Sequence, residues 1–202
     1  MFELLDSVDV LCTALQCSPS YLHEAVTRQQ LYCNPLVIPR RRASTKPRTV
    51  WSVSDPVRRL QRQVALWLRA ASNAQENHVT GFRDDSTPFK NASQHIGTLS
   101  REAEEEVLTA DLSDFFGTIE IGDVMKVFED LGAKRPASTV LARLCTIDEH
   151  LMQGGRASAP ISNLVGDRLD KIILAELAPG CVYTRYVDDL TISGLRALEW
   201  IT

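Results

Sequence analysis

Tyr186-Val187-Asp188-Asp189 places two adjacent carboxylates between segments 182–185 and 190–193, which alternate as β-strands do. A strand, a short acidic turn and a second strand predict a β-hairpin with carboxylates at its tip. Consecutive strand residues point to opposite faces, so both aspartates reach one point only if the turn twists the backbone. The two carboxylates repel each other, and a divalent cation with oxygen ligands would relieve that repulsion. Because Asp is common in turns, a solvated turn is the alternative interpretation.

A second acidic segment lies upstream, at residues 107–116. It begins as an apolar run long enough for one buried strand, and Asp111 falls near the end of that strand. Three carboxylates on two neighbouring strands, Asp111, Asp188 and Asp189, match the donor set that holds two magnesium ions in phosphoryl transfer. The sequence therefore predicts nucleotidyl transfer, with these three aspartates as the catalytic and metal-binding residues.

Basic residues are concentrated in one segment, although the net charge of the whole chain is −4. Residues 40–69 hold nine Lys and Arg residues against one acid, Asp55. Such a patch is expected where a protein binds phosphates. Two interpretations stay open for Arg58, Arg59 and Arg62, which are either template contacts or the solvated face of a basic helix.

Length and composition favour a compact domain without a membrane anchor. With 202 residues, 44% of them hydrophobic, the chain can bury one substantial core or two small ones. Its five cysteines show no CxxC spacing, which argues against zinc and against a disulfide framework. The N-terminus carries Glu3, Asp6 and Asp9 where a signal peptide carries basic residues, and no apolar run reaches membrane-spanning length. We therefore predict a cytoplasmic protein with reduced thiols.

Local patterns predict a mixed order of helices and strands. Strands are expected at 36–39 and 49–53 around a basic loop, and residues 73–100 are expected to be largely loop. Helices are expected twice in residues 1–30, with the second starting at Ser18-Pro19, then after the cap Asp55-Pro56, at 123–131, from Ser138 toward residue 150, and from the cap Ser162-Asn163 to residue 178.

Three ordered blocks resemble the palm of a reverse transcriptase. They are the strand with Asp111 followed by Phe115-Phe116, the segment 153–163 that begins Gln153-Gly154-Gly155, and the hairpin with Asp188-Asp189. Within that family, Asn91-Ala92-Ser93-Gln94-His95 and Tyr183-Thr184-Arg185-Tyr186 are most similar to the bacterial retron group. The similarity runs from about residue 28 to about residue 194, nearly the whole chain.

The resemblance implies an α+β fold with the fingers and palm of a right-hand polymerase, in which a mainly antiparallel palm sheet packs on helices. Residues 1–100 would then form the N-terminal helices and fingers and residues 101–202 the palm, with the two interleaved. The implied activity is RNA-directed DNA synthesis, in which a primer is extended on an RNA template, in the making of multicopy single-stranded DNA and in phage defence. Thirteen residues follow Asp189, whereas a retron-like enzyme continues into a helical thumb, so we expect the palm to be incomplete and the thumb to be missing.

The resemblance also assigns residues to a metal and nucleotide site. Two Mg²⁺ ions, with Mn²⁺ as the alternative, would be held by the three aspartates and the backbone carbonyl of Leu112. Phe116 would exclude a ribose 2′-hydroxyl by bulk, while Phe115 is expected to be the buried ring of the pair. Met152 replaces a proline of the family pattern, and Gly155-Arg156 replaces Ala-Pro. The nucleotide-binding residues implied are Lys46, Arg48, Ser113, Asp114, Phe115, Phe116, Gln153 and Gly154.

The implied partners are nucleic acids and nucleotides. They are a structured non-coding RNA that serves as template and primer, the nascent DNA, deoxynucleoside triphosphates, and an effector protein or a subunit that supplies a thumb, with no membrane involved. The residues assigned to nucleic-acid binding are Arg40, Arg41, Arg58, Arg62, Asn91, His95, Ser162, Asn163 and Tyr186.

Two other functions stay open at this point. One is a catalytically silent polymerase fold that binds structured RNA or a partner subunit, which the intact acids argue against and the missing thumb argues for. The other is a template-independent or RNA-dependent polymerase on the same palm, and Phe116 argues against ribonucleotides. If the thumb is missing, we expect weak, salt-sensitive binding of a duplex and self-association of the chain.

Overall fold

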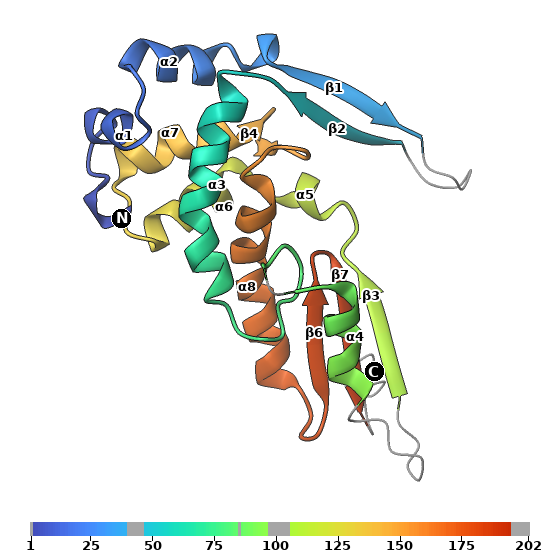
Figure 1. Ribbon diagram of the computed structural model, residues 1–202. Helices are drawn as coiled ribbons and strands as arrows, with labels where there is room; N and C mark the ends of the chain where they lie inside the picture. The colour runs from blue at the N-terminus through green and yellow to red at the C-terminus, as the bar shows by residue number, and fades with distance from the viewer. Residues whose placement is uncertain (1, 40–46, 85, 97–105, 195–202) are drawn as a thin grey trace. The chain divides into compact units, whose positions relative to one another are not determined.

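The computed structural model describes residues 2–39, 47–84, 86–96 and 106–194 (Figure 1). The chain forms two compact units, Met1–Leu68 with Phe116–Ile161, and Arg69–Phe115 with Ser162–Thr202. Two of the three boundaries between them fall inside long helices, α3 (Val57–Asn73) and α8 (Ser158–Glu176), and the third lies between Phe115 and Phe116. Helices and antiparallel sheets together make the chain an α+β protein, as expected. The expected boundary near residue 100 and the assignment of fingers and palm stay predictions.

The first unit begins with short helices whose starts are set by serine caps. The Ser7 hydroxyl accepts a hydrogen bond from the Val10 amide, and the Ser18 hydroxyl accepts one from the Tyr21 amide at 3.2 Å. Each bond satisfies an amide that the first helical turn leaves unpaired. The predicted start at Ser18-Pro19 is therefore confirmed. The elements are η1 (Phe2–Leu4), α1 (Val8–Ala14), α2 (Pro19–Thr27) and η2 (Gln29–Leu31).

An antiparallel hairpin of β1 (Cys33–Ile38) and β2 (Arg48–Val53) follows in the same unit. Its register runs from Cys33 opposite Val53 to Ile38 opposite Arg48, which confirms the predicted pair of strands. Helix α3 begins at Val57 and not at a side-chain cap from Asp55, whose carboxylate instead accepts a bond from Arg58 Nε at 3.0 Å.

The rest of the first unit differs from the expected helix after Ser138. Helix α7 (Arg135–Cys145) starts earlier, because a proline in its first turn has the backbone angle a helix start requires, and Ser138 is buried inside it. A small hairpin, β4 (Thr146–Ile147) and β5 (His150–Leu151), then replaces the predicted continuation. The two turn residues, Asp148 and Glu149, both have positive φ, as a tight two-residue hairpin turn demands. Along the chain, helices α5 (Phe115–Thr118) and α6 (Ile121–Asp130) come before α7.

The second unit contains a three-stranded antiparallel sheet in the order β3-β7-β6. Its strands are β3 (Glu106–Asp111), β6 (Val182–Tyr186) and β7 (Asp189–Gly194). Helix α8 packs on one face, where Ile173 contacts a cluster that includes Tyr183 and Ile192. Helix α4 (Pro88–Ile96) lies beside β6 (Figure 1).

Two expectations for this unit are wrong. Strand β3 is not buried: within the described residues it pairs with β7 alone, and Val107 is half exposed. Helix α8 starts at Ser158, four residues before the predicted cap, so Ser162 and Asn163 lie inside the helix and are fully buried. Among the helices that the structure describes, none combines the length and the apolar character needed to cross a membrane.

A buried ion pair joins α8 to the sheet. Arg185 and Asp170 are both 0% exposed, and Arg185 donates from Nε to Asp170 Oδ1 and from Nη2 to Oδ2, each at 2.7 Å. The Tyr183 hydroxyl donates to Asp170 Oδ1, also at 2.7 Å. Burial alone would raise the pKa of Asp170, but hydrogen bonding by Arg185, His78 and Tyr183, together with the charge of Arg185, lowers this pKa to about 2.

The lowered pKa of Asp170 makes stability depend on acid. The carboxylate releases its proton more readily in the folded state than in the unfolded chain, so its contribution is fully present above about pH 4 and is lost between about pH 4 and pH 2. Over this window the free energy of unfolding should fall about 2 kcal/mol further in the wild type than in Asp170→Asn, measured by urea unfolding at each pH.

Asp167→Asn is the control for this measurement, because Asp167 forms a partly exposed pair with Lys171 on the same helix. Exposed pairs contribute little, so this variant should follow the wild-type curve. Parallel curves for the wild type and Asp170→Asn would contradict the assignment of the acid sensitivity to Asp170.

Candidate active site

Three aspartates meet at one end of the β3-β7-β6 sheet. Asp111 is the last residue of β3 and lies directly opposite Asp189, the first residue of β7. Asp188 lies in the two-residue turn between β6 and β7, and its carbonyl accepts a hydrogen bond from the Leu112 amide at 2.9 Å. The predicted hairpin is therefore confirmed, and a backbone bond ties its turn to the end of β3.

The turn itself has an unusual backbone. Val187, which precedes Asp188, has φ of 64°. This left-handed conformation is rare for a β-branched residue, and it supplies the twist needed between the two strands. Tyr186, on the other side of the turn, pairs directly with Asp189, so the tyrosine and the aspartate share a face of the sheet.

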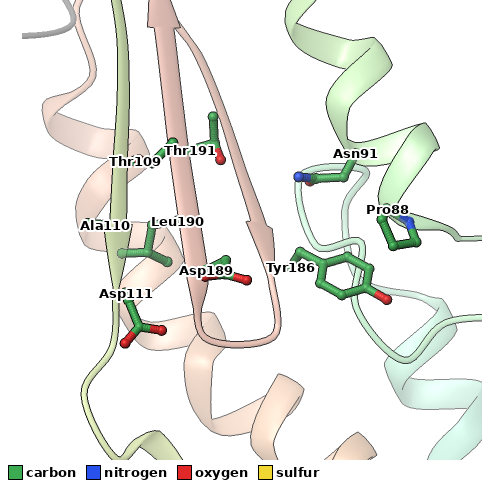
Figure 2. Close-up of a pocket in the computed structure, with 9 residues that line it drawn as sticks. All are labelled: Pro88, Asn91, Thr109, Ala110, Asp111, Tyr186, Asp189, Leu190 and Thr191. Atoms are coloured by element: carbon green, nitrogen blue, oxygen red, sulfur yellow. The ribbon is translucent and has the colours of Figure 1, made fainter. Parts of the chain in front are cut away.

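A pocket of 420 Å³ opens beside two of these carboxylates. Figure 2 shows Asp111 and Asp189 at the strand ends, with the Asn91 side chain pointing from α4 toward the hairpin. The lining residues come from α4, β3 and the hairpin: they are Pro88, Asn91, Thr109, Ala110, Asp111, Tyr186, Asp189, Leu190 and Thr191.

The carboxylates influence one another electrostatically. Partial burial raises the pKa of Asp189, and the charges of Asp188 and Asp111 raise it further. Within the described residues, no three His, Cys, Asp or Glu side chains converge closely enough to hold a metal ion. The donor chemistry fits a hard cation, since all three groups offer carboxylate oxygens and a bound cation would relieve the repulsion seen at Asp189.

Helix α4 is fastened to the face of the sheet that carries the pocket. His95 is 6% exposed, and its ring nitrogens contact the hydroxyls of Thr184 and Ser193, each at 2.7 Å. Burial lowers the pKa of this histidine, which favours the neutral ring. The Thr80 hydroxyl donates to the Asn91 amide oxygen at 2.6 Å. The expectation that His95 contacts RNA does not agree with this burial, because both ring nitrogens are used to hold α4 on β6 and β7.

Ser162 and Asn163 are also unavailable to a nucleic acid. Both are 0% exposed, and Asn163 Nδ2 donates to the Gly81 carbonyl at 2.6 Å. The expected contact with nucleic acid came from the family resemblance, and separately the sequence pattern predicted these two residues as a helix cap. They lie one turn inside α8, where they face the interior of the unit.

The expected phosphate-binding residues belong to the first unit. Arg48 is exposed at the start of β2, and Arg58 and Arg62 are exposed on α3. This exposure agrees with both interpretations of the basic helix, so the choice between them stays open. Lys46, Arg40 and Arg41 lie outside the described residues.

Gln153 and Gly154 form a close contact with strand β2 in the same unit. The Trp51 amide donates to the Gln153 carbonyl at 2.7 Å. Gly154 has φ of 100°, and a Cβ there would lie 2.6 Å from the Trp51 carbonyl oxygen. Only glycine satisfies both conditions, so this loop is fixed against the strand that begins with Arg48.

The residues after β3 reverse one expectation. Ser113 and Asp114 are exposed, and Asp114 has positive φ. Phe116 is the buried ring at 8% exposure, whereas Phe115 is partly exposed, the opposite of the predicted order. Both rings lie in the single turn of α5, and the two adjacent positions point in different directions from the helix axis, so only one of them enters the core.

Arg185 and Asp170 were not anticipated from the sequence. The pattern contained a usable indication, because strand alternation puts Arg185 on the same face as Tyr183, and a charged residue on an inward face requires a partner. Asp170 and Ile173 lie three residues apart on α8 and therefore on one side of the helix. An inward arginine and an inward aspartate on neighbouring elements predict a buried pair.

The repulsion at Asp189 can be tested directly. Asp111→Asn removes one of the negative charges that raise the pKa of Asp189, so this pKa should fall toward its ordinary value. A carboxyl-carbon NMR titration measures it without metal. Asp167→Asn, on the outer side of α8, should leave the Asp189 titration as in the wild type. An unchanged Asp189 pKa in Asp111→Asn would show that the two strand ends are not electrostatically coupled.

The sequence matches one protein family and several curated relatives. The pattern of the family described as reverse transcriptase (RNA-dependent DNA polymerase) matches residues 38–196. The retron Ec86 reverse transcriptase of Escherichia coli is 37% identical over 114 residues, which cover 56% of this chain and 34% of that protein. The retron Mx162 reverse transcriptase of Myxococcus xanthus is 30% identical over 225 aligned positions, which cover 96% of this chain and 43% of that protein. The chain thus spans less than half the length of these relatives.

Proposed function

Because the chain belongs to the reverse transcriptase family and is of the retron type, we propose that it extends a primer with deoxynucleotides on an RNA template, as the fingers and palm of an RNA-directed DNA polymerase. The observation that carries the proposal is the pairing of Asp111 with Asp189 across β3 and β7, with Asp188 in the adjoining turn. The pocket beside them gives a substrate access to the carboxylates.

The three aspartates are the proposed ligands of two Mg²⁺ ions, or of Mn²⁺ in their place, together with the Leu112 carbonyl. When bound, such ions make an attacking hydroxyl more acidic and stabilise the charge on a leaving pyrophosphate. The raised pKa of Asp189 supports the assignment, because negative charge already crowded at the site favours a cation.

Other residues of the chain are proposed to bind and orient the substrates. Arg48 would hold the triphosphate through its guanidinium fork, together with Lys46, and the Gln153-Gly154 loop would support that end of the fingers. Tyr186 and Asn91 line the pocket and would contact the nucleic acid near the carboxylates. Exposed Arg58 and Arg62 would contact backbone phosphates further away. Arg40, Arg41, Ser113 and Asp114 complete the proposed set.

The wider role proposed follows from the relatives, whose names identify them as retron enzymes. We propose that the template and primer are a structured non-coding RNA and that the product is multicopy single-stranded DNA made in the cytoplasm. A role in phage defence with an effector protein is part of the same proposal.

Primer extension is the decisive test of the function. Asp188→Asn should abolish incorporation of deoxynucleotides on an RNA template with Mg²⁺, because the substitution removes a charged metal ligand without changing the size of the side chain. Extension is followed on a gel, and circular dichroism checks the fold. Asp167→Asn should extend primers as the wild type does. Wild-type extension by Asp188→Asn would remove this aspartate from the chemistry.

Sugar selection is proposed to depend on Phe116. Phe116→Ala should raise incorporation of ribonucleotides relative to deoxynucleotides, with a change of about 1 to 3 kcal/mol in discrimination if steric exclusion alone is relieved. The ratio of kcat/KM for the two sugars measures it, and circular dichroism checks the fold, because the Phe116 ring is buried and loss of folding in Phe116→Ala would make it a core residue instead. Phe115→Ala is the comparison, because its partly exposed ring lies next along the chain. A change in selectivity confined to Phe115→Ala would move the sugar contact to that ring.

A further inference from the structure

Arg185 uses every hydrogen-bond donor of its guanidinium group inside the second unit. Beyond the two bonds to Asp170, Nη1 donates to Asn163 Oδ1 at 3.3 Å and to the Val187 carbonyl at 3.1 Å, and Nη2 donates to the Asn163 carbonyl at 3.1 Å. An arginine has five N–H groups, and these five bonds occupy all of them. The guanidinium is therefore held in one orientation.

One of these bonds reaches the turn that carries the active-site acids. Val187 directly precedes Asp188, and its left-handed backbone is costly for a β-branched residue. Such a conformation persists only where the surroundings enforce it. The bond from Arg185 to the Val187 carbonyl acts at this point, on the residue that sets the direction of Asp188.

Two glycines allow the turn to be held this closely. A Cβ on Gly166 of α8 would lie 2.6 Å from the Arg185 guanidinium carbon, so only a glycine lets the helix approach. A Cβ on Gly81 would lie 2.6 Å from both the Val187 amide nitrogen and one of its methyl groups. Asn163 joins the two contacts, since it donates to the Gly81 carbonyl and accepts from Arg185.

The segment before Gly81 fixes the same strand from its outer edge. The Arg185 amide donates to the His78 carbonyl at 2.8 Å, and the Thr80 amide donates to the Arg185 carbonyl at 2.9 Å. Arg185 is thus fixed at its backbone by residues 78–80 and at its side chain by α8. The position of Arg185 therefore does not depend on its bond to the Val187 carbonyl.

We propose that Arg185, held by Asp170 and Asn163, is a positioning residue that fixes the Val187-Asp188 turn so that Asp188 and Asp189 face Asp111. The role in catalysis rests on the proposed polymerase function. The fixing of the turn does not rest on that function, because it follows from the contacts of Arg185 alone. The Leu112 amide reports on that hold, since its acceptor is the Asp188 carbonyl.

The test must separate positioning from stability. Single removal of either charge leaves the other buried and unpaired, which destabilises a protein whatever its function. The double variant Arg185→Met with Asp170→Asn removes both charges, and the new amide oxygen still accepts the Tyr183 hydroxyl. Replacing a buried pair by uncharged groups is often neutral, but Met also removes the donors to the Asn163 and Val187 oxygens, so some loss of melting temperature is expected and circular dichroism checks that the variant folds.

Two readouts decide the proposal. In the double variant, hydrogen exchange at the Leu112 amide, measured by NMR, should become faster than in the wild type, because the Asp188 carbonyl is no longer held. In primer extension, kcat should fall about a hundredfold with an unchanged nucleotide KM, as expected for misplaced catalytic groups. Wild-type exchange at Leu112 and wild-type kcat in a folded double variant would overturn the proposal.

The matched control is Lys171→Met with Asp167→Asn, which removes an exposed ion pair from the same helix. It should leave exchange and kcat as in the wild type. If the double variant at Arg185 and Asp170 fails to fold, Arg185→Lys is the variant that tests the proposal. It keeps the charge but cannot reach Asp170 and Val187 together. Faster Leu112 exchange in folded Arg185→Lys supports the proposal, and wild-type exchange overturns it.

The exchange measurement also separates the two proposals of function and positioning. If the wild type shows no primer extension while Leu112 exchange responds to the variants, the polymerase function fails and the hold on the turn stands. If extension is normal in the wild type and Leu112 exchange does not respond, the positioning role fails and the polymerase function stands.

Discussion

Mutual repulsion among three carboxylates is the constraint around which the second unit is built. Asp111, Asp188 and Asp189 are brought to one end of a sheet, where partial burial, and then the charges of Asp188 and Asp111, raise the pKa of Asp189. The backbone bond from Leu112 to Asp188 holds them together, and the packing of α4 and α8 on the sheet keeps the strands from which they project in place.

The two faces of the sheet are secured in different ways. On one face, α8 contributes apolar contacts around Ile173 and a charged contact through Asp170. On the other, α4 is attached through His95, a single neutral ring between two hydroxyls. The pocket beside the carboxylates is lined by Pro88 and Asn91 of α4, whereas Asp170 of α8 and its partner Arg185 are fully buried.

Local sequence patterns were sufficient for the features that local interactions determine. The hairpin with Asp188 and Asp189 could be predicted because alternation and an acidic turn are properties of neighbouring residues, and the cap at Ser18 because a capping bond spans three residues. Ser138 and Ser162 misled for the same reason. Small polar residues favour helix starts, but tertiary packing buried both of these inside helices that begin earlier.

Residues whose role depends on distant partners were beyond a local pattern. His95 resembles a group-specific block, yet its contacts lie on strands about ninety positions later. The order of Phe115 and Phe116 in the core depends on how α5 packs, which their adjacency does not encode. Arg185 could have been identified by combining strand alternation with the rule that buried charges are paired, although its bond to the Val187 carbonyl could not.

Helix α8 buries a stripe of Asn163, Gly166 and Asp170 before it turns apolar at Ile173. By the usual measures of helix and core quality this stripe is poor, since it places a helix-weakening glycine and two polar side chains where leucine would pack. A redesign that rewarded burial of apolar surface would replace all three. It would raise the score of the helix and remove the space and the partners that Arg185 needs, so these positions should be held fixed in any stabilised version of the chain.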